Sequence, residues 1–162
     1  MSRISTTSGA KLYIGTTLAI GEGSPPAEYD DDTYVEVGEI ENLGEIGDES
    51  PLVPFTAIGD ARTRKLKGAR DAGTMTVVVG RDPLDAGQEA MKDAERTKYD
   101  YNFKLEFADA PSEDYSDSVM YFTGKVASQR TQLGANDDVT KVSFQIAVNS
   151  DVEETESELL SP

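Results

Sequence analysis

The stretch Tyr99-Asp100-Tyr101-Asn102-Phe103-Lys104-Leu105-Glu106-Phe107 alternates apolar and polar side chains without a break. Successive side chains of a β-strand point to opposite faces, so this pattern predicts a strand with one face on a core and one toward solvent. Strands of this kind are typical of antiparallel sheets. Other segments that predict strands are Lys11–Thr17, Tyr34–Ile40, Gly73–Val79, Ser118–Ala127 and Val139–Val148.

One helix is predicted between two of these strands, at about residues 83–96. Asp82-Pro83-Leu84-Asp85 is typical of a helix start, with Asp82 as the N-cap and Pro83 in the first turn. Leu84, Met91 and Ala94 are expected to face inward, and Gly87 should weaken the helix by about 1 kcal/mol relative to Ala. The fold class is therefore mainly β: an antiparallel sandwich or open barrel with one inserted helix and a long extended loop.

The 162 residues fit one domain. We expect a flexible N-terminal arm over residues 1–10, a β domain over 11–148, and an acidic, flexible tail over 149–162. Gly21–Thr33 and Gln129–Asp138 are predicted to be loops from their turn-forming residues. No run approaches the about 20 apolar residues of a membrane span, and no secretion signal is recognisable, so we expect a protein that is made in a cytoplasm.

The composition of the chain excludes most kinds of catalytic site. The chain has no Cys and no His, so it lacks thiolate ligands and the commonest general base. No phosphate-cradling or dinucleotide glycine pattern is present. Asp30-Asp31-Asp32 is consecutive, whereas Ca²⁺ loops place their oxygen ligands at alternate positions. We expect no catalytic residue, no metal and no cofactor, and hence no enzyme.

Charge is distributed unevenly along the chain. The formal net charge is −16, and every charged residue between Leu12 and Ala61 is Asp or Glu. Such a surface argues against a body that grips nucleic acid, because that binding needs cations to neutralise phosphates. Two readings stay open: an acidic surface that only keeps the protein soluble, and one that must not adhere to nucleic acid.

The loop at about residues 44–73 contains a basic cluster over residues 62–70, opposite in sign to the chain as a whole. It is long, rich in Gly and Pro, and predicted to lack compact structure, which in a domain of this size usually marks a functional or disordered segment. A basic loop on an acidic body favours docking onto another copy of that body. A nucleic-acid patch would be expected to interleave aromatic residues, which this cluster lacks, and a merely exposed loop remains an alternative. The proposed contact residues are Arg62, Arg64, Lys65, Lys67 and Arg70.

The order of these features resembles the tail tube proteins of long-tailed bacteriophages, over about residues 10–148. The first matching pieces are Val35–Leu43 and the loop with its Lys65-Leu66-Lys67-Gly68 stretch. Thr74–Val77, followed by Asp82-Pro83 and the helix, resembles the family's passage from strand to helix. The late strands are matched by Tyr101–Leu105 and Phe122–Val126.

This resemblance implies a structural virion protein of the tail, assembled in the host cytoplasm without a membrane. Its subunits would form hexameric rings that stack into a hollow tube, with the long loop reaching a neighbouring ring. The implied partners are further copies, a tape-measure protein in the lumen, and tail terminator and tail tip proteins, with DNA only in transit. An acidic lumen would repel DNA. The expected lumen-facing residues are Glu36, Glu39 and Glu41, and then Asp100, Asn102 and Glu106.

Other assignments remain open at this point. The chain could be another phage tail protein or a head–tail joining protein. It could also form the tube of a contractile or secretion-type injection system. From a different class, a β-sandwich module that binds at a cell surface would also fit the strand pattern.

Overall fold

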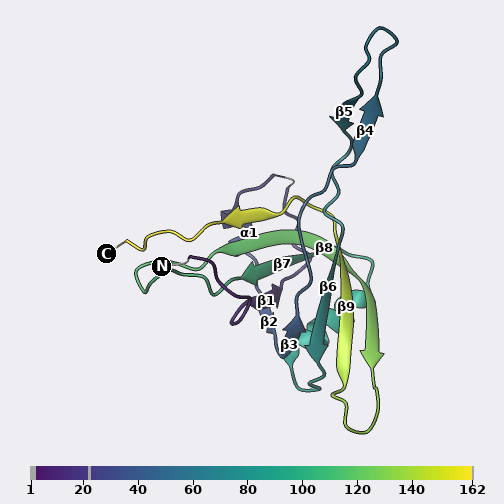
Figure 1. Ribbon diagram of the computed structural model, residues 1–162. Coiled ribbons are helices and arrows are strands. Elements are labelled where there is room, and N and C mark those ends of the chain that lie inside the picture. The colour runs from purple at the N-terminus through teal and green to yellow at the C-terminus, as the bar shows by residue number, and fades with distance from the viewer. Residues whose placement is uncertain (1–2, 22, 162) are drawn as a thin grey trace.

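The computed structural model describes residues 3–21 and 23–161 (Figure 1). Within these residues, no helix is long and apolar enough to cross a bilayer. In chain order the elements are β1 (Lys11–Ile14), α1 (Pro26–Asp30), β2 (Val35–Val37), β3 (Ile40–Asn42), β4 (Leu52–Phe55), β5 (Arg64–Lys67), β6 (Thr74–Gly80), α2 (Ala86–Glu95), β7 (Tyr101–Glu106), β8 (Val119–Gln132), β9 (Lys141–Val148) and β10 (Glu153–Thr155).

The body is one antiparallel sheet in the order β2-β1-β7-β8-β9-β6-β3, with β10 also paired to β8. The long strand β8 belongs to two layers, because its first half pairs with β7 and its second half with β9. A register shift between Val126 and Ser128 marks the bend between the halves. In Figure 1, β7 and the start of β8 run across the view, whereas β6 and β9 run down it.

The sheet curls so far that its two ends are joined by a very short connection. β2 and β3 stand at opposite ends of the strand order, yet only Gly38 and Glu39 separate them in the chain. Glu39 turns the chain with a φ of 56°. The single strand predicted over Tyr34–Ile40 is therefore wrong, because the chain breaks here into two strands of different layers. The result is the predicted antiparallel open barrel.

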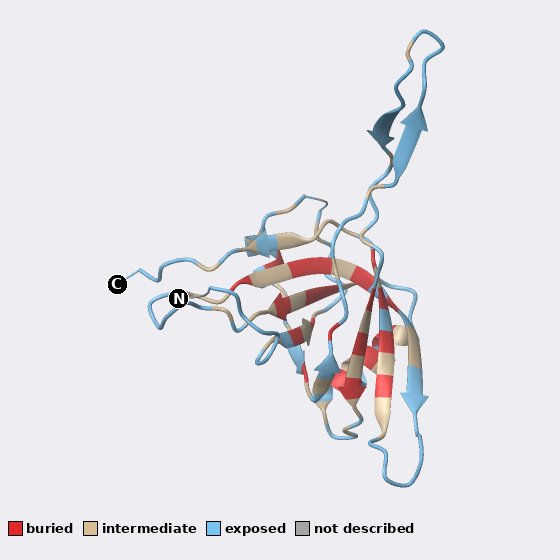
Figure 2. Cartoon of the chain, viewed as in Figure 1, coloured by how far each residue is buried: buried red, intermediate tan, exposed pale blue. Residues whose placement is uncertain are grey.

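The core lies between the two layers and follows the predicted alternation. Phe103 on β7 stacks on Phe122 of β8 with ring centroids 5.2 Å apart. On β9, the alternate residues from Val142 to Val148 are buried, as predicted. Figure 2 shows this as buried segments that alternate with less buried ones along the strands. Tyr99, expected on the same apolar face, is 66% exposed because β7 begins only at Tyr101.

Helix α2 covers one side of the barrel but begins later than predicted. Its N-cap is Asp85, whose side chain accepts a hydrogen bond from the Gln88 backbone N–H at 2.9 Å. Asp82 closes a preceding turn instead, accepting from the Leu84 N–H at 3.0 Å. Leu84 therefore lies outside the helix and is 92% exposed, contrary to the prediction, whereas Met91 is buried as predicted.

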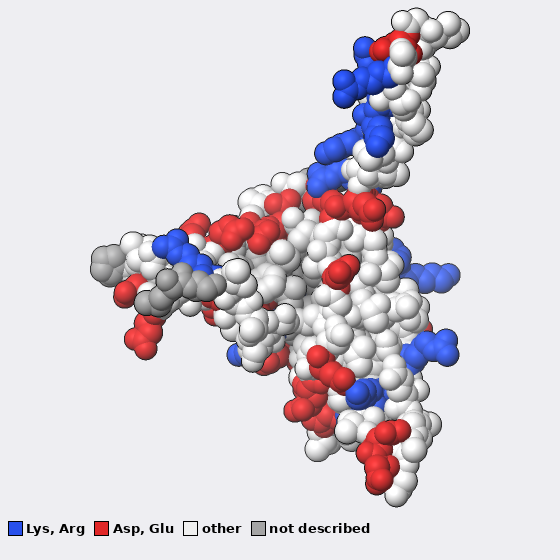
Figure 3. Space-filling view, in the orientation of Figure 1, with Lys and Arg blue, Asp and Glu red and all other residues white. Residues whose placement is uncertain are grey.

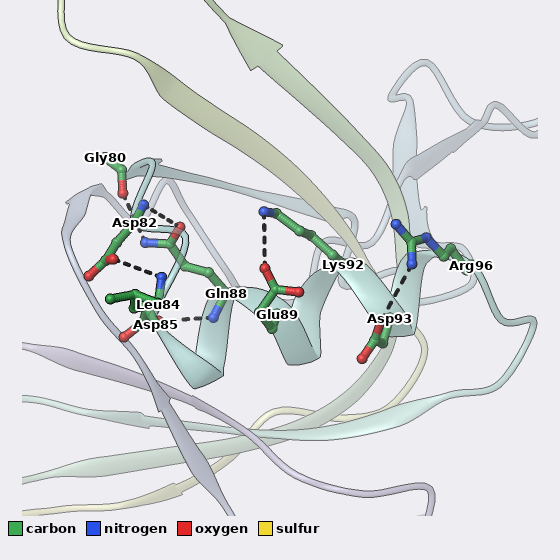
Figure 4. A network of polar contacts seen from close by, with 9 residues as sticks. All are labelled: Gly80, Asp82, Leu84, Asp85, Gln88, Glu89, Lys92, Asp93 and Arg96. Carbon is green, nitrogen blue, oxygen red and sulfur yellow. Dashed lines mark hydrogen bonds and ion pairs between the residues drawn. The ribbon is translucent and has the colours of Figure 1, made fainter.

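Gln88 connects helix α2 by hydrogen bonds to the place where the barrel closes between β2 and β3 (Figure 4). Its side-chain amide is fully buried and donates to the carbonyls of Gly38 and Gly80, at 3.1 and 2.8 Å. Gly87 is set by the same close packing, because a Cβ there would lie 2.0 Å from the Glu36 carbonyl oxygen. The glycine that weakens the helix in isolation is thus what lets the helix approach β2.

Apart from the loop at about residues 44–73, three segments predicted to lack regular structure contain it. α1 forms within the predicted loop Gly21–Thr33. β8 continues to Gln132, through the start of the predicted turn region, because it follows β9 to Lys141. In the segment predicted as an unstructured acidic tail, β10 pairs with β8. A strand at a sheet edge is held by its backbone hydrogen bonds, so its acidic side chains do not prevent the pairing.

Candidate assembly surface

Residues 50–70 form a hairpin that leaves the body, here called the projecting hairpin (Figure 1). Its strands β4 and β5 make a separate two-stranded antiparallel sheet. The prediction of a loop without structure was therefore wrong, although the segment does stand away from the core. At its base, Glu49 and Asp71 form a backbone bridge with N···O distances of 2.8 Å in both directions.

Both faces of the projecting hairpin mix apolar and basic side chains. Paired residues of antiparallel strands share a face, so the Val53–Leu66 and Phe55–Arg64 pairs lie on one side. The pairs Leu52–Lys67 and Pro54–Lys65 lie on the other. Phe55 is 57% exposed and Leu66 60%, and Ile58 in the tip is fully exposed.

This exposure is unusual for a free surface. An isolated two-stranded hairpin is marginally stable in water, and a contiguous exposed apolar patch marks an interaction site. Sequence reasoning emphasised the charges of this segment and missed its apolar residues. The run Leu52-Val53-Pro54-Phe55 followed by Ile58 was the available signal, because no polar alternation marks it as half-buried.

The structure brings the predicted basic residues together along the hairpin, where they lie mainly on one side in Figure 3. Arg64 donates to Asp60 at 3.1 Å, and the backbone N–H of Arg62 donates to the same carboxylate at 3.1 Å. Arg70 pairs with Asp48 at the base. Lys65 and Lys67 form no ion pair with any residue that the structure describes, so their charges are available to a partner.

Two glycines at the base direct the hairpin away from the sheet. Gly44 and Gly73 have φ values of +68° and +72°, a region that residues with a Cβ rarely adopt. A Cβ on Gly44 would also lie 2.6 Å from the carbonyl oxygen of Thr76 on β6. The exit of the hairpin is therefore fixed by backbone geometry at the two glycines that bound the predicted loop.

A hollow lies beside this exit, here called the base pocket, with a volume of about 830 Å³. Side chains on or next to β3, β6, β7 and β8 make its apolar floor: Leu43, Met75, Leu105, Phe107 and Met120. Carboxylates from the segments that lead into and out of the hairpin also line the pocket: Glu45, Asp48, Glu49 and Asp71. Figure 3 shows acidic atoms directly beneath the basic side of the hairpin. Sequence analysis did not predict this pocket, because its floor and rim come from distant parts of the chain.

The acids expected to face a lumen lie on different strands and turns of the barrel. Glu36 on β2 and Glu106 on β7 flank Tyr13, where burial first and then these two carboxylates raise the pKa of the Tyr13 hydroxyl. Glu41 stands on β3, at the other end of the strand order, and pairs with Lys141 at 2.7 Å.

The remaining expected residues have separate surroundings. Asp100 accepts from Lys125 at 2.6 Å. Glu39 occupies the turn between β2 and β3.

The expectation that Asn102 faces a lumen is wrong, because its side chain is 1% exposed. Its amide nitrogen donates to the Leu18 carbonyl and to Asp32, both at 2.9 Å, and its amide oxygen accepts from Thr123. Partial burial would raise the pKa of Asp32, but hydrogen bonds from Thr16, Asn102 and Thr33 lower it below its usual value. The segment before β2 thus covers the polar face of β7, so Asn102 cannot line a channel.

No protein-family model matches the chain, and no curated protein matches its sequence. Solved structures do match its fold. A chain in the cryo-EM structure of the anti-feeding prophage baseplate, solved with six-fold symmetry, has a TM-score of 0.71 at 8% identity, over 96% of this chain and 98% of that one. A chain in the SPP1 tail tube, from solid-state NMR and cryo-EM, has a TM-score of 0.57 at 15% identity, over 92% and 78%. The chain therefore shares its fold with a tail tube protein and with a protein of a prophage baseplate.

Proposed function

We propose that this chain is a structural, non-enzymatic protein of a phage tail or a phage-derived tail-like particle, and that copies of it assemble through the projecting hairpin. The observation that carries the proposal is the hairpin itself. It exposes apolar side chains that a monomer has no reason to display, and it is basic on a chain of net charge −16. The fold shared with tail and baseplate structures supports this assignment.

The assembly that fits best is a set of hexameric rings stacked into a hollow tube within a virion tail. The hairpin would reach a copy in the next ring, offsetting the repulsion between like-charged bodies. A tape-measure protein would occupy the lumen during assembly, terminator and tip proteins would close the ends, and DNA would only pass through. Net charge supports an acidic wall.

A second candidate is a baseplate component that forms one ring and does not stack further. The baseplate neighbour favours it, because that chain matches with the higher TM-score and over nearly its whole length. Negative-stain images of the concentrated protein distinguish the two candidates. Long stacks support the tube, whereas single rings that do not grow support the baseplate component.

The proposal is tested by reversing the charge of the hairpin. The triple variant Arg64→Glu, Lys65→Glu and Lys67→Glu should remain folded by circular dichroism but stay monomeric in sedimentation velocity. Because these side chains are exposed, their reversal should not disturb the core.

A matched control carries the same charge change on the body, at three other exposed residues: Arg96→Glu, Lys98→Glu and Arg130→Glu. The control should assemble much as the wild type does. Assemblies of normal size from the hairpin variant would refute the proposed role of the hairpin.

A further inference from the structure

The base pocket has the chemistry that the projecting hairpin requires of a partner. Its floor offers the apolar side chains of Phe107 and Met120, which are only partly buried in the isolated chain. Exposed carboxylates of Glu45 and Glu49 stand at its rim. One face of the hairpin offers exposed Leu52 and Pro54 beside Lys65 and Lys67, two lysines that form no ion pair among the residues the structure describes. Apolar surface thus meets apolar surface, and opposite charges surround it.

The hairpin does not fill the pocket of its own chain. Residues 43–49 and 71–75 line the pocket as they lead into and out of the hairpin, while β4 and β5 stand clear of the body (Figure 1). A pocket of about 830 Å³ lies within the roughly 300–1,000 Å³ range of sites that enclose a drug-sized ligand, which corresponds to a few side chains. The pocket therefore suits one face of a hairpin.

We infer that the base pocket of one copy receives the face of the next copy's projecting hairpin that carries Leu52 and Pro54, with Glu45 and Glu49 contacting Lys65 and Lys67 of that same face. This inference rests on the proposed function and names the acceptor that the hairpin binds. The contact joins two different surfaces of the same chain, so it is heterologous and leaves a free hairpin at one end and a free pocket at the other. Such a contact can continue from copy to copy.

Two charge-reversed variants test the acceptor. The hairpin variant is Lys65→Glu with Lys67→Glu, and the pocket variant is Glu45→Lys with Glu49→Lys. All four side chains are exposed, and both variants are checked for wild-type folding by circular dichroism. Each variant alone should raise the critical concentration for assembly more than tenfold, because like charges then face each other. Mixed in equal amounts they should assemble again, because each hairpin meets a pocket of opposite charge.

A control with Glu113→Lys and Asp137→Lys makes the same charge change at exposed sites away from the pocket, and should assemble as the wild type does. Recovery in the mixture alone supports the acceptor. Normal assembly of the pocket variant beside a monomeric hairpin variant overturns the acceptor but leaves the hairpin's role intact. A monomeric mixture also overturns the acceptor. Normal assembly of both variants, or a wild type that never assembles, overturns the proposed function itself.

Discussion

Truncation of Phe55 to Ala should weaken assembly by a predictable amount. Phe55 is 57% exposed in the isolated chain. Complete burial of a Phe side chain contributes about 1.5–3 kcal/mol, so burial of the exposed part corresponds to about 1–2 kcal/mol for each hairpin contact. Since about 1.4 kcal/mol is a factor of ten, the critical concentration should rise roughly 5- to 30-fold.

The measurement is the concentration at which assemblies appear in sedimentation velocity, for the wild type and for Phe55→Ala. Stability is measured in parallel by urea unfolding of dilute monomer. Its free energy of unfolding should change by no more than about 0.5 kcal/mol, because Phe55 lies outside the core. Tyr99→Ala is the matched control, since Tyr99 is an aromatic residue on the body and is 66% exposed.

Equal critical concentrations for Phe55→Ala and Tyr99→Ala would contradict this prediction, because Phe55 would then contribute nothing to the contact between copies. A large loss of monomer stability in Phe55→Ala would also refute it. That result would mean that Phe55 supports the fold of the subunit rather than a contact between subunits.

Two further predictions concern the fold. Gly87→Ala should lower the free energy of unfolding by about 1–3 kcal/mol, since overpacking against the Glu36 carbonyl outweighs the gain in helix propensity; higher stability in urea would contradict this. Acid should destabilise the monomer, because hydrogen bonds lower the pKa of Asp32 and, chiefly through the Ser118 N–H, that of Asp109. Their contribution is present above the unfolded-state pKa near 4 and is lost as pH falls through the lower folded-state values. A Thr16→Val variant, which removes one hydrogen bond to Asp32, should lose less stability in acid than the wild type.

Strands with one face toward solvent could be predicted from the sequence. Strands whose polar face is covered by another segment of the chain could be predicted only in part. β9 alternates throughout, so its buried residues from Val142 to Val148 were predictable. β7 alternates as well, but its polar residue Asn102 is buried by a segment that precedes β2 in the chain. Nothing in a local pattern reports which distant segment will cover a polar face.

Boundaries and turns were harder to predict for a different reason. Asp82 and Asp85 are both good N-caps, and long-range contacts of Asp85 and Gln88 with the backbone of Gly38 and Gly80 favour Asp85. The break at Glu39 has no sequence signal, because a non-glycine residue there adopts positive φ. Both features are imposed by closure of the barrel.

The candidate assembly surface could also be predicted only in part from the sequence. The basic residues of the hairpin could be predicted, since charge is read directly from the sequence. The base pocket could not, because Leu43, Leu105 and Met120 meet only after the two layers form. The exposed state of Phe55 likewise depends on the hairpin standing away from the body.

Assembly through the projecting hairpin is tested by a cryo-EM reconstruction of the wild-type protein at high concentration. We expect repeating assemblies in which density for residues 50–70 lies against a second copy of the chain. Assemblies whose hairpins extend freely into solvent, or a protein that remains monomeric at every concentration, would contradict it.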